Sequence, residues 1–284
     1  MHPEKWRETA DPFHLPMRQF RLLEVLGYPH AGNDVFHVRG EMQGAAAEAY
    51  IKAARHSEAN LRHEAKMLRL LRMPDIPQVL ECDEDRFSWC VTAALPGRRL
   101  SVILCGGEEE SLPYMEKWGA RMARLHGMRG DFPAAPHRRF MDAPPEEYCR
   151  RHGLEDIRRW LLENPISDGE KCLCHGDGHY ANVLWENGEI SALVDWELAG
   201  LGDREFDLAW AMIRRPGQRF MNTEAEYRLF LSGYEKAGGA FDSVRLRWYM
   251  VCAWVWFCGI GAEDADYAAW VRRALEMVTV KTLP

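Results

Sequence analysis

Three side chains with oxygen ligand atoms, Asp177, Asn182 and Asp195, occur within one short stretch of the chain. Carboxylate and amide oxygens are the ligands that magnesium prefers, and bound magnesium also keeps waters and phosphate oxygens as ligands. If folding draws the three side chains together, they would form a site for magnesium and a phosphate-bearing ligand. The alternative is a polar loop with a local side-chain turn beside an ordinary hairpin.

A predicted hairpin is the element that would bring these side chains together. Asn187-Gly188 separates two apolar runs, and both residues tolerate a positive φ, which is typical of a two-residue hairpin turn. Residues that face each other across such a hairpin lie about 5 Å apart. In this register Asn182 would lie opposite Leu193, and Asp195 would be level with Tyr180.

The order of these residues resembles a known group of kinases. His175-Gly176-Asp177, then Asn182, then Asp195-Trp196-Glu197 after the hairpin is similar to the aminoglycoside phosphotransferase and choline kinase superfamily of small-molecule kinases. Protein kinases have the related loop H-R-D-x-x-x-x-N, in which the aspartate is the base and the asparagine binds metal. The resemblance implies that Asp177 accepts the proton of the substrate hydroxyl. It also implies that Asn182 and Asp195 hold Mg2+ on the phosphates of ATP.

Further residues near this motif have roles that the resemblance implies. Asp207 would be a structural carboxylate that steadies the catalytic loop through His175. Glu197 stands where protein kinases have the glycine of D-F-G, and it would contact a second metal or the substrate, or be structural. Gly178 departs from the bulkier apolar residue that is usual in the family. The glycine-rich run 199–203 is expected to form a mobile turn.

A second candidate pair, Lys52 and Glu64, lies in the first third of the sequence. Residues 49–53 are predicted to form a strand, and 58–72 a helix that Ser57 can cap. Glu64 falls on the apolar face of that helix, and a buried carboxylate is costly unless it is paired. Lys52 is the candidate partner, unless Glu64 lies at the edge of the face and reaches water. The pair matches the strand lysine and helix glutamate of kinases, which place the lysine on the phosphates of ATP.

Two loops complete the nucleotide site that the resemblance implies. Gly32 and Asn33 suit a tight turn between two strands, where backbone amides can approach phosphates, although an ordinary hairpin turn has the same sequence. Pro96-Gly97 ends the following strand pattern and indicates a hinge between two lobes. In the family the backbone before this hinge contacts the adenine, which implies nucleotide contacts at Ala93 and Leu95.

The whole chain is consistent with an α+β, bilobal, protein-kinase-like fold. Its 284 residues suffice for one large domain or two lobes. We expect residues 1–95 to form an N-terminal nucleotide-binding lobe, with an antiparallel sheet and one helix. Residues 96–284 would form a mostly helical catalytic and substrate-binding lobe. Helices are predicted at 112–126, 146–162, 225–237, 243–258 and 262–278.

The helix predicted at 243–258 is rich in aromatic residues, including Trp248 and Trp254. Aromatic residues at helical spacing are usually core, and we expect the same here. The alternative is that some of these rings, with acidic residues at 263–266, form a wall that receives a cationic substrate.

Composition and sequence pattern indicate which partners and which cellular compartment to expect. The net charge of −7 argues against nucleic-acid binding, which needs basic patches. The N-terminus lacks a signal-peptide pattern, and the apolar stretch 249–260 is shorter than the roughly 20 residues that span a bilayer. No C-x-x-C pair occurs among the eight cysteines, and Cys172 and Cys174 are expected on opposite sides of a strand. We expect a cytoplasmic protein with reduced, mostly buried cysteines and without a zinc site.

Three functions are compatible with these features. The first is ATP-dependent phosphorylation of a hydroxyl on a small molecule, in the manner of an aminoglycoside phosphotransferase, with ATP or GTP and Mg2+ as cofactors and a role in antibiotic resistance. The second is a metabolic kinase for choline, a sugar or an amino alcohol. The third is an inactive nucleotide-binding scaffold, which the set of Lys52, Asp177, Asn182 and Asp195 argues against. The partner would be a small alcohol, with a cationic one as an option, and the protein a monomer or dimer.

Overall fold

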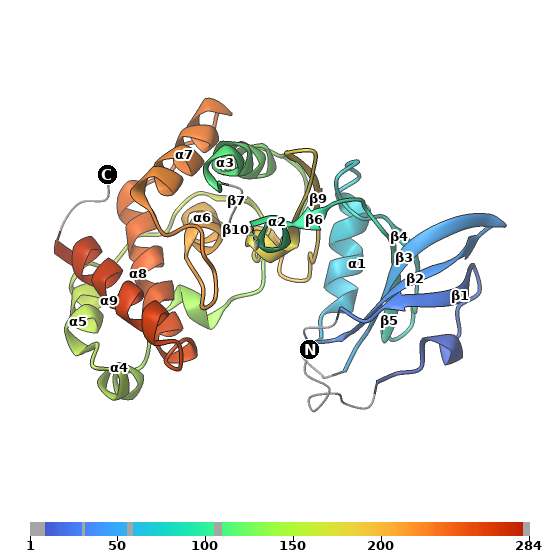
Figure 1. Cartoon of the computed structure of the whole chain (residues 1–284), viewed down its shortest axis with the longest axis horizontal. Helices are drawn as coiled ribbons and strands as arrows, with labels where there is room; N and C mark the ends of the chain where they lie inside the picture. The colour runs from blue at the N-terminus through green and yellow to red at the C-terminus, as the bar shows by residue number, and fades with distance from the viewer. Residues whose placement is uncertain (1–8, 30–31, 56–58, 105–109, 281–284) are drawn as a thin grey trace. The chain divides into compact units, whose positions relative to one another are not determined.

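The computed structural model describes residues 9–29, 32–55, 59–104 and 110–280 (Figure 1). The chain divides into two compact units. The first consists of Met1–Pro96 and Ala192–Glu197, and the second of Gly97–Ser191 and Leu198–Pro284. The predicted boundary between 95 and 96 lies beside the first division. Ala192–Glu197, which that prediction places in the second lobe, belongs instead to the first unit.

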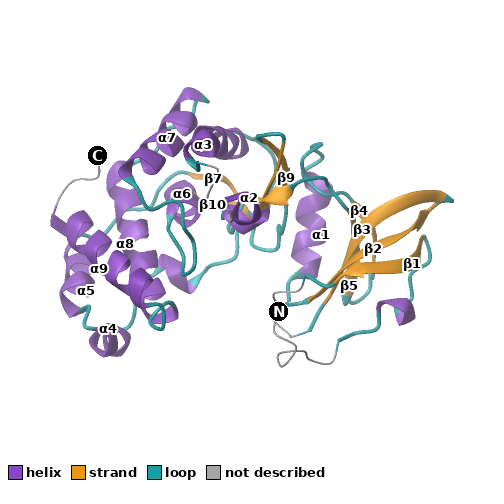
Figure 2. Cartoon of the chain, viewed as in Figure 1, coloured by secondary structure: helices purple, strands orange, loops and turns teal. Residues whose placement is uncertain are grey.

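The first unit is built on a five-stranded antiparallel sheet in the order β1-β2-β3-β5-β4 (Figure 2). Side chains alternate between the two faces of a strand, and Val38, Ala49, Ile51 and Val91 are fully buried in the core of this sheet. The strands are β1 (Phe20–Gly27), β2 (Asp34–Met42), β3 (Ala45–Ala53), β4 (Val79–Cys82) and β5 (Trp89–Ala93).

The helix of this unit, α1 (Leu61–Leu70), is shorter than the predicted 58–72. It begins after Asn60, whose side chain makes no capping hydrogen bond. The helix ends at Leu70. It cannot continue through Met73, because Met73 precedes Pro74 and a residue before a proline disfavours the helical conformation. The predicted cap, Ser57, lies outside the described residues. The apolar face is buried as predicted, and Glu64 is buried with it.

The second unit is mostly helical among its described residues, as predicted for this part of the chain. Gly153 has a φ of 62° and ends α4 in the left-handed conformation, so the predicted helix 146–162 is two helices. The helices are α2 (Leu100–Ile103), α3 (Leu112–His126), α4 (Glu146–His152), α5 (Glu155–Glu163), α6 (Arg204–Met212), α7 (Glu224–Lys236), α8 (Ser243–Ile260) and α9 (Ala265–Val280).

Helix α8 supplies much of the core of the second unit. Trp248 is 9% exposed, and Cys252 and Val255 are fully buried, so the predicted core role of this helix is confirmed. Glycines let α3 and α7 approach closely, because a Cβ atom at Gly119 would lie 1.8 Å from the carbonyl oxygen of Phe230. Within the described residues, no helix combines the length and the apolar character that crossing a membrane requires.

Two small sheets carry the central motif. Strand β7 (Lys171–Cys174) pairs antiparallel with β10 (Gly200–Asp203). The predicted mobile turn at 199–203 is therefore mostly a paired strand. The other sheet has the order β6-β8-β9 and contains β6 (Arg98–Arg99), β8 (Val183–Glu186) and β9 (Glu189–Leu193). The final residues of β9, Ala192 and Leu193, belong to the first unit.

The turn of the β8–β9 hairpin has the predicted geometry. Asn187 and Gly188 have φ angles of 52° and 74°, as a two-residue turn of this type requires. The pairing does not extend as far as predicted. Tyr180–Asn182 forms a 3-10 turn, η5, instead of an extended strand facing Leu193.

Candidate active site

Lys52 is the centre of a charge cluster in the first unit. Its Nζ atom lies 2.8 Å and 3.0 Å from the two carboxylate oxygens of Glu64, and 2.9 Å from Oδ1 of Asp195. The side chains of Lys52 and Glu64 are only 18% and 10% exposed, so water screens this ion pair weakly. The structure thus shows the predicted ion pair, and Glu64 does not extend into solvent.

Three carboxylates surround the ammonium group of Lys52. Burial disfavours the charged form, but the negative charges of Glu64, Asp195 and Glu197 outweigh burial and raise the pKa of Lys52 above its usual range. Carboxylate oxygens of these three residues lie within 4.8 Å of one another. Hard oxygen donors at this spacing fit a divalent cation such as Mg2+. Asp195 and Glu197 are the better ligands, because both oxygens of Glu64 are bonded to Lys52.

The segment that carries Asp195 is anchored within the first unit by its neighbours. Leu193 donates its backbone N–H to the carbonyl oxygen of Asp75 at 2.9 Å. Trp196 is fully buried and donates its backbone N–H to Glu64 at 3.3 Å. These contacts hold Asp195 at a φ of 70°, a conformation that costs a residue with a side chain about 1 kcal/mol or more.

Asp177 lies in the second unit, in the loop between β7 and η5. Asn182 donates from Nδ2 to the backbone oxygen and to Oδ2 of Asp177, both at 3.0 Å. Trp210, on α6, donates from Nε1 to Oδ1 at 2.6 Å. Because the amide nitrogen of Asn182 bonds Asp177, its carbonyl oxygen is the atom that would ligate a metal. The two side chains that share the loop motif are thus in direct contact.

Positive charge keeps the carboxylate of Asp177 ionised. Burial favours the neutral acid, but the hydrogen bond to His179 and the charges of His179, Arg138 and Arg215 outweigh it. They hold the pKa of Asp177 well below its usual range. A carboxylate that is ionised at neutral pH can accept a hydrogen bond from a substrate hydroxyl.

A buried carboxylate on α6 fixes the backbone of this loop. Asp207 accepts hydrogen bonds from the backbone N–H groups of His175 and Gly176, both at 2.8 Å. These bonds support the predicted link to His175, and the structure shows that they involve its backbone N–H. Gly176 has a φ of 76°, and a Cβ atom there would lie 2.0 Å from the carbonyl oxygen of Leu198. A glycine is therefore required where protein kinases have arginine.

Comparison with known proteins decides the family. The model of the phosphotransferase enzyme family, APH, matches residues 26–249. The chain belongs to the phosphotransferase enzyme family. The predicted family and the protein-kinase-like fold class are thereby confirmed.

Individual relatives cover different shares of the chain. Acyl-CoA dehydrogenase family member 11 of Mus musculus is 39% identical over 59 residues, which are 20% of this chain and 8% of that protein. Hygromycin-B 4-O-kinase of Escherichia coli is 32% identical over 98 residues, 34% of this chain and 26% of that kinase. The chain therefore matches only a small part of the length of these curated relatives.

Similarity of the fold extends over nearly the whole chain. A thermostable mutant of aminoglycoside phosphotransferase APH(4)-Ia, solved in a ternary complex with ADP and hygromycin B, has a TM-score of 0.59 at 18% identity. The match covers 91% of this chain and 94% of that one. At 18% identity this similarity shows a shared fold and nothing more.

Four residues predicted to contact the nucleotide of this phosphotransferase lie in the first unit. Gly32 is exposed, with nothing within 4 Å of the position of a Cβ atom, and Asn33 is buried. The backbone N–H of Ala93 is bonded to Gln78 at 2.8 Å, so its carbonyl oxygen is the group that would meet an adenine. Leu95 follows, half-buried, after β5. The nucleotide contacts of all four stay predictions.

The predicted metal pair of the phosphotransferase is divided between the units. Asn182 belongs to the second unit and Asp195 to the first. Asn182 is hydrogen-bonded to Asp177, and Asp195 accepts from Lys52. Both contacts are consistent with the predicted roles. Their joint metal site stays a prediction.

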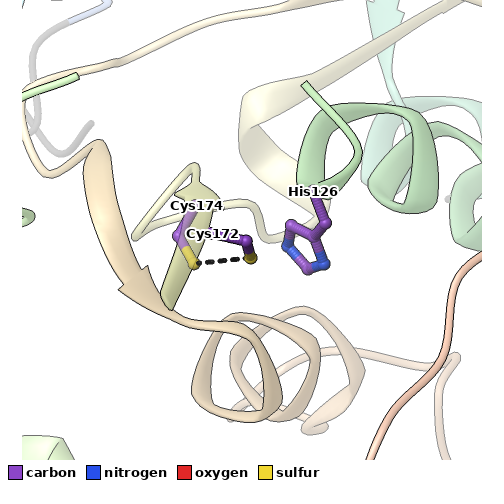
Figure 3. Close-up of side chains that lie close together, drawn as sticks. All are labelled: His126, Cys172 and Cys174. Atoms are coloured by element: carbon purple, nitrogen blue, oxygen red, sulfur yellow. Dashed lines mark hydrogen bonds between the residues drawn. The ribbon is translucent and has the colours of Figure 1, made fainter. Parts of the chain in front are cut away.

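The second unit contains a buried cluster of side chains that sequence spacing did not reveal. Figure 3 shows the ring of His126 beside the thiols of Cys172 and Cys174, and the donor atoms of the three lie within 4.8 Å of one another. Both ring nitrogens of His126 are already bonded, to Tyr234 at 2.8 Å and to Asp207 at 3.1 Å. With both ring nitrogens bonded, His126 has a structural role in the core of the second unit.

The cysteine pair also corrects a prediction. The sulfur atoms of Cys172 and Cys174 are 3.8 Å apart, on one face of β7. The expectation of opposite faces is wrong, because residues two apart on a strand point to the same side. The cysteines among the described residues, at 82, 90, 149, 172, 174, 252 and 258, are buried free thiols.

Sequence reasoning missed Arg138, Trp210 and Arg215, the side chains that surround Asp177. Trp210 had a detectable signal, since it follows Asp207 by three residues on a helix and must share its face. Arg138 lies in an irregular segment without periodicity, where no local pattern indicates a contact with residue 177. Arg215 follows α6, and its guanidinium donates to the carbonyl oxygen of Trp210 at 2.9 Å.

Proposed function

We propose that this chain transfers the γ-phosphoryl group of ATP, or of GTP, to a hydroxyl of a small molecule. The observation that carries the proposal is the setting of Asp177. Its carboxylate is ionised, 19% exposed, and fixed by Asn182 and Trp210 in the loop that the family uses for catalysis. A scaffold that only bound nucleotide would have no need of this arrangement.

The nucleotide would bind through the charge cluster of the first unit. Lys52, held by Glu64, would contact the α- and β-phosphates, with Gly32 and Asn33 at the phosphate loop and Ala93 and Leu95 at the adenine. The ternary complex of the related aminoglycoside phosphotransferase contains ADP, which supports a nucleotide site in this fold. Mg2+ held by Asn182 and Asp195, with Glu197, would supply positive charge against the charge that develops on the phosphates.

Asp177 would then orient the acceptor hydroxyl. The hydroxyl oxygen forms a bond to the γ-phosphorus as the bond to the leaving ADP breaks, and the hydroxyl proton passes to Asp177. Because the pKa of Asp177 is lowered, the carboxylate is a weak base, and its main contribution is alignment. This agrees with phosphoryl transfer in general, where positioning and electrostatics outweigh early proton removal.

The acceptor is proposed as a small alcohol. The names of relatives include hygromycin B, gentamicin and spectinomycin, which supports an antibiotic as acceptor and a role in resistance. A metabolic alcohol such as choline, a sugar or an amino alcohol is the alternative. We also propose a cytoplasmic location, which the buried free thiols support.

Replacement of Asp177 tests the reaction. We expect Asp177→Ala to lower ATP consumption with a panel of alcohols by about 100-fold or more, while nucleotide binding, measured by calorimetry, stays intact. Asp156→Ala is the matched control, because Asp156 is an exposed side chain on α5. Phosphoryl transfer that persists in Asp177→Ala would reject the proposed role of this residue.

A further inference from the structure

Cationic side chains lie beside Asp177. The largest charge effects on its carboxylate come from His179, Arg138 and Arg215. Nη1 of Arg138 lies 3.3 Å from Oδ1 of Asp177 and also donates to the carbonyl oxygen of Gly176. The side chains of Arg138 and Asp177 are 14% and 19% exposed, so both reach solvent. A chain with a net charge of −7 thus concentrates positive charge beside its candidate catalytic residue.

A second arginine follows Arg138 in the sequence, and aromatic rings lie against both guanidinium groups. Arg139 is exposed in the 3-10 turn η4 (Arg139–Met141), and its guanidinium carbon lies 5.1 Å from the ring centre of Trp256. The guanidinium carbon of Arg138 lies 3.9 Å from the ring centre of Trp210. Planar guanidinium groups stack well on aromatic faces, so an aromatic ring supports each of the two arginines.

The contacts between arginine side chains and aromatic rings disfavour a cationic acceptor. A quaternary ammonium group binds by lying over aromatic faces. Here the chain's own guanidinium groups already lie over Trp210 and Trp256, through Arg138 and Arg139. The ammonium groups of an aminoglycoside would also meet the like charges of Arg138 and its neighbour, an arrangement that rejects a ligand.

We propose that the phosphate acceptor is an alcohol that carries an anionic group, a carboxylate or a phosphate, next to its reacting hydroxyl. Arg138 and Arg139 bind this group, because the guanidinium fork matches both anions with two parallel N–H bonds. The bound anion competes with Asp177 for Arg138, which leaves the carboxylate of Asp177 to the hydroxyl. This inference rests on the proposed function and names the class of acceptor for that reaction.

A screen of matched acceptors tests the inference on the full chain. Hydroxy acids are compared with their amides, and sugar phosphates with the free sugars, alongside hygromycin B and choline, with ATP consumption as the readout. We expect kcat/KM to be about 10- to 100-fold higher for the anionic member of a productive pair, as for a hydrogen bond to a charged group. The hydroxy-acid and sugar-phosphate arms distinguish a carboxylate from a phosphate.

Variants of Arg138 locate the effect. Arg138→Gln removes the contact with Asp177 for every acceptor, so the readout is the ratio within a pair. It should lower kcat/KM for the anionic acceptor about tenfold or more relative to that for its uncharged partner. Arg138→Lys should keep part of the preference, because the charge remains. Arg228→Gln is the matched control, an exposed arginine paired with Glu224 on α7, and should change nothing. If Arg138 only positioned the loop, its loss would lower kcat equally for both members of a pair, and the inference would be wrong.

The same experiments separate an error in the inferred acceptor class from an error in the proposed function. Phosphorylation of uncharged or cationic members with equal or higher kcat/KM overturns the inference and leaves the proposed function intact. If no acceptor raises ATP consumption above the intrinsic rate, and Asp177→Ala has the same rate, the proposed function itself is wrong. If Arg138→Gln shows no thermal unfolding transition, the variant does not fold, and Arg139→Gln is measured with the same acceptor pairs instead. A lower preference for the anionic member in Arg139→Gln supports the inference, and an unchanged preference overturns it.

Discussion

The indole nitrogen of Trp210 lies 2.6 Å from Oδ1 of Asp177. Trp210 is one turn beyond Asp207 on α6, and Asp207 binds the backbone of His175 and Gly176. One face of one helix therefore fixes both the backbone of the loop that carries Asp177 and the carboxylate of Asp177 itself. Hydrogen bonds to an ionised group of this kind are shorter and stronger than neutral ones.

Replacement of Trp210 by phenylalanine should separate orientation from binding. Trp210→Phe keeps an aromatic ring but removes the N–H donor, so the carboxylate of Asp177 loses one constraint. We expect kcat to fall about tenfold, the equivalent of one net hydrogen bond, with KM for ATP unchanged. Steady-state kinetics measure both, and Trp160→Phe on α5 is the control. An unaltered kcat would show that Asn182 alone is sufficient to orient Asp177.

Loss of the charge on Glu64 should weaken nucleotide binding. Glu64→Gln keeps the size of the side chain but leaves Lys52 with weaker support, so we expect the affinity for ATP to fall about tenfold, or 1.4 kcal/mol. Calorimetric titration with ATP measures this change. Glu48→Gln is the control, since Glu48 lies on β3 with its side chain 50% exposed. Equal affinities in Glu64→Gln and wild type would remove the nucleotide role from the Lys52–Glu64 pair.

Replacement of Asp195 should affect the metal more than the nucleotide. We expect Asp195→Asn to weaken ADP binding about tenfold in the presence of Mg2+, and to have a much smaller effect in EDTA. The difference between the two titrations isolates the metal. Asp85→Asn, at an exposed position in the same unit, controls for surface charge. An equal loss of ADP affinity with Mg2+ and in EDTA would mean that Asp195 acts only through its ion pair with Lys52.

The pH dependence of stability should report Asp207. Burial favours the neutral acid, but hydrogen bonds and charges from His126 and His175 outweigh it and lower the pKa of Asp207 from 3.8. Its contribution is therefore fully present above about pH 4 and is lost as the pH falls through the lower, folded value. We expect Asp207→Asn to reduce the free energy of unfolding by about 3 kcal/mol at pH 7.

Denaturant titrations across pH measure this contribution. The difference between Asp207→Asn and wild type should narrow below about pH 4, where Asp207 begins to bind a proton in the unfolded chain while the folded chain still holds it ionised. Asp156→Asn, exposed on α5, should change the free energy of unfolding by less than about 0.5 kcal/mol. A difference that stays constant from pH 7 to pH 3 would contradict the role of the ionised carboxylate.

Local signals account for the features that sequence alone predicted well. Asn187-Gly188 determines its own turn, because the φ angles of a two-residue hairpin suit these residues. The pairing of Glu64 with Lys52 follows from one physical demand, since a carboxylate on an apolar helix face needs a cationic partner. The His-Gly-Asp motif required no knowledge of distant contacts.

Features that depend on distant segments were missed. Arg138 and Asp177 are far apart in sequence, and nothing in the irregular segment around Arg138 indicates that they meet. The glycines at 200 and 202 suggested a turn, but their backbone is paired in a strand because β7 supplies the hydrogen bonds. Gly153 interrupts an otherwise continuous amphipathic pattern, so a break between α4 and α5 is hard to see from periodicity alone.

The polypeptide passes between its two units at 96/97, 191/192 and 197/198. An N-terminal fragment that stopped at Pro96 would lack Trp196, whose backbone binds Glu64, and Leu193, whose amide binds Asp75. Such a fragment would have the lysine of the charge cluster without Asp195. Neither unit can be expressed alone, or exchanged with that of a relative, as one uninterrupted cassette.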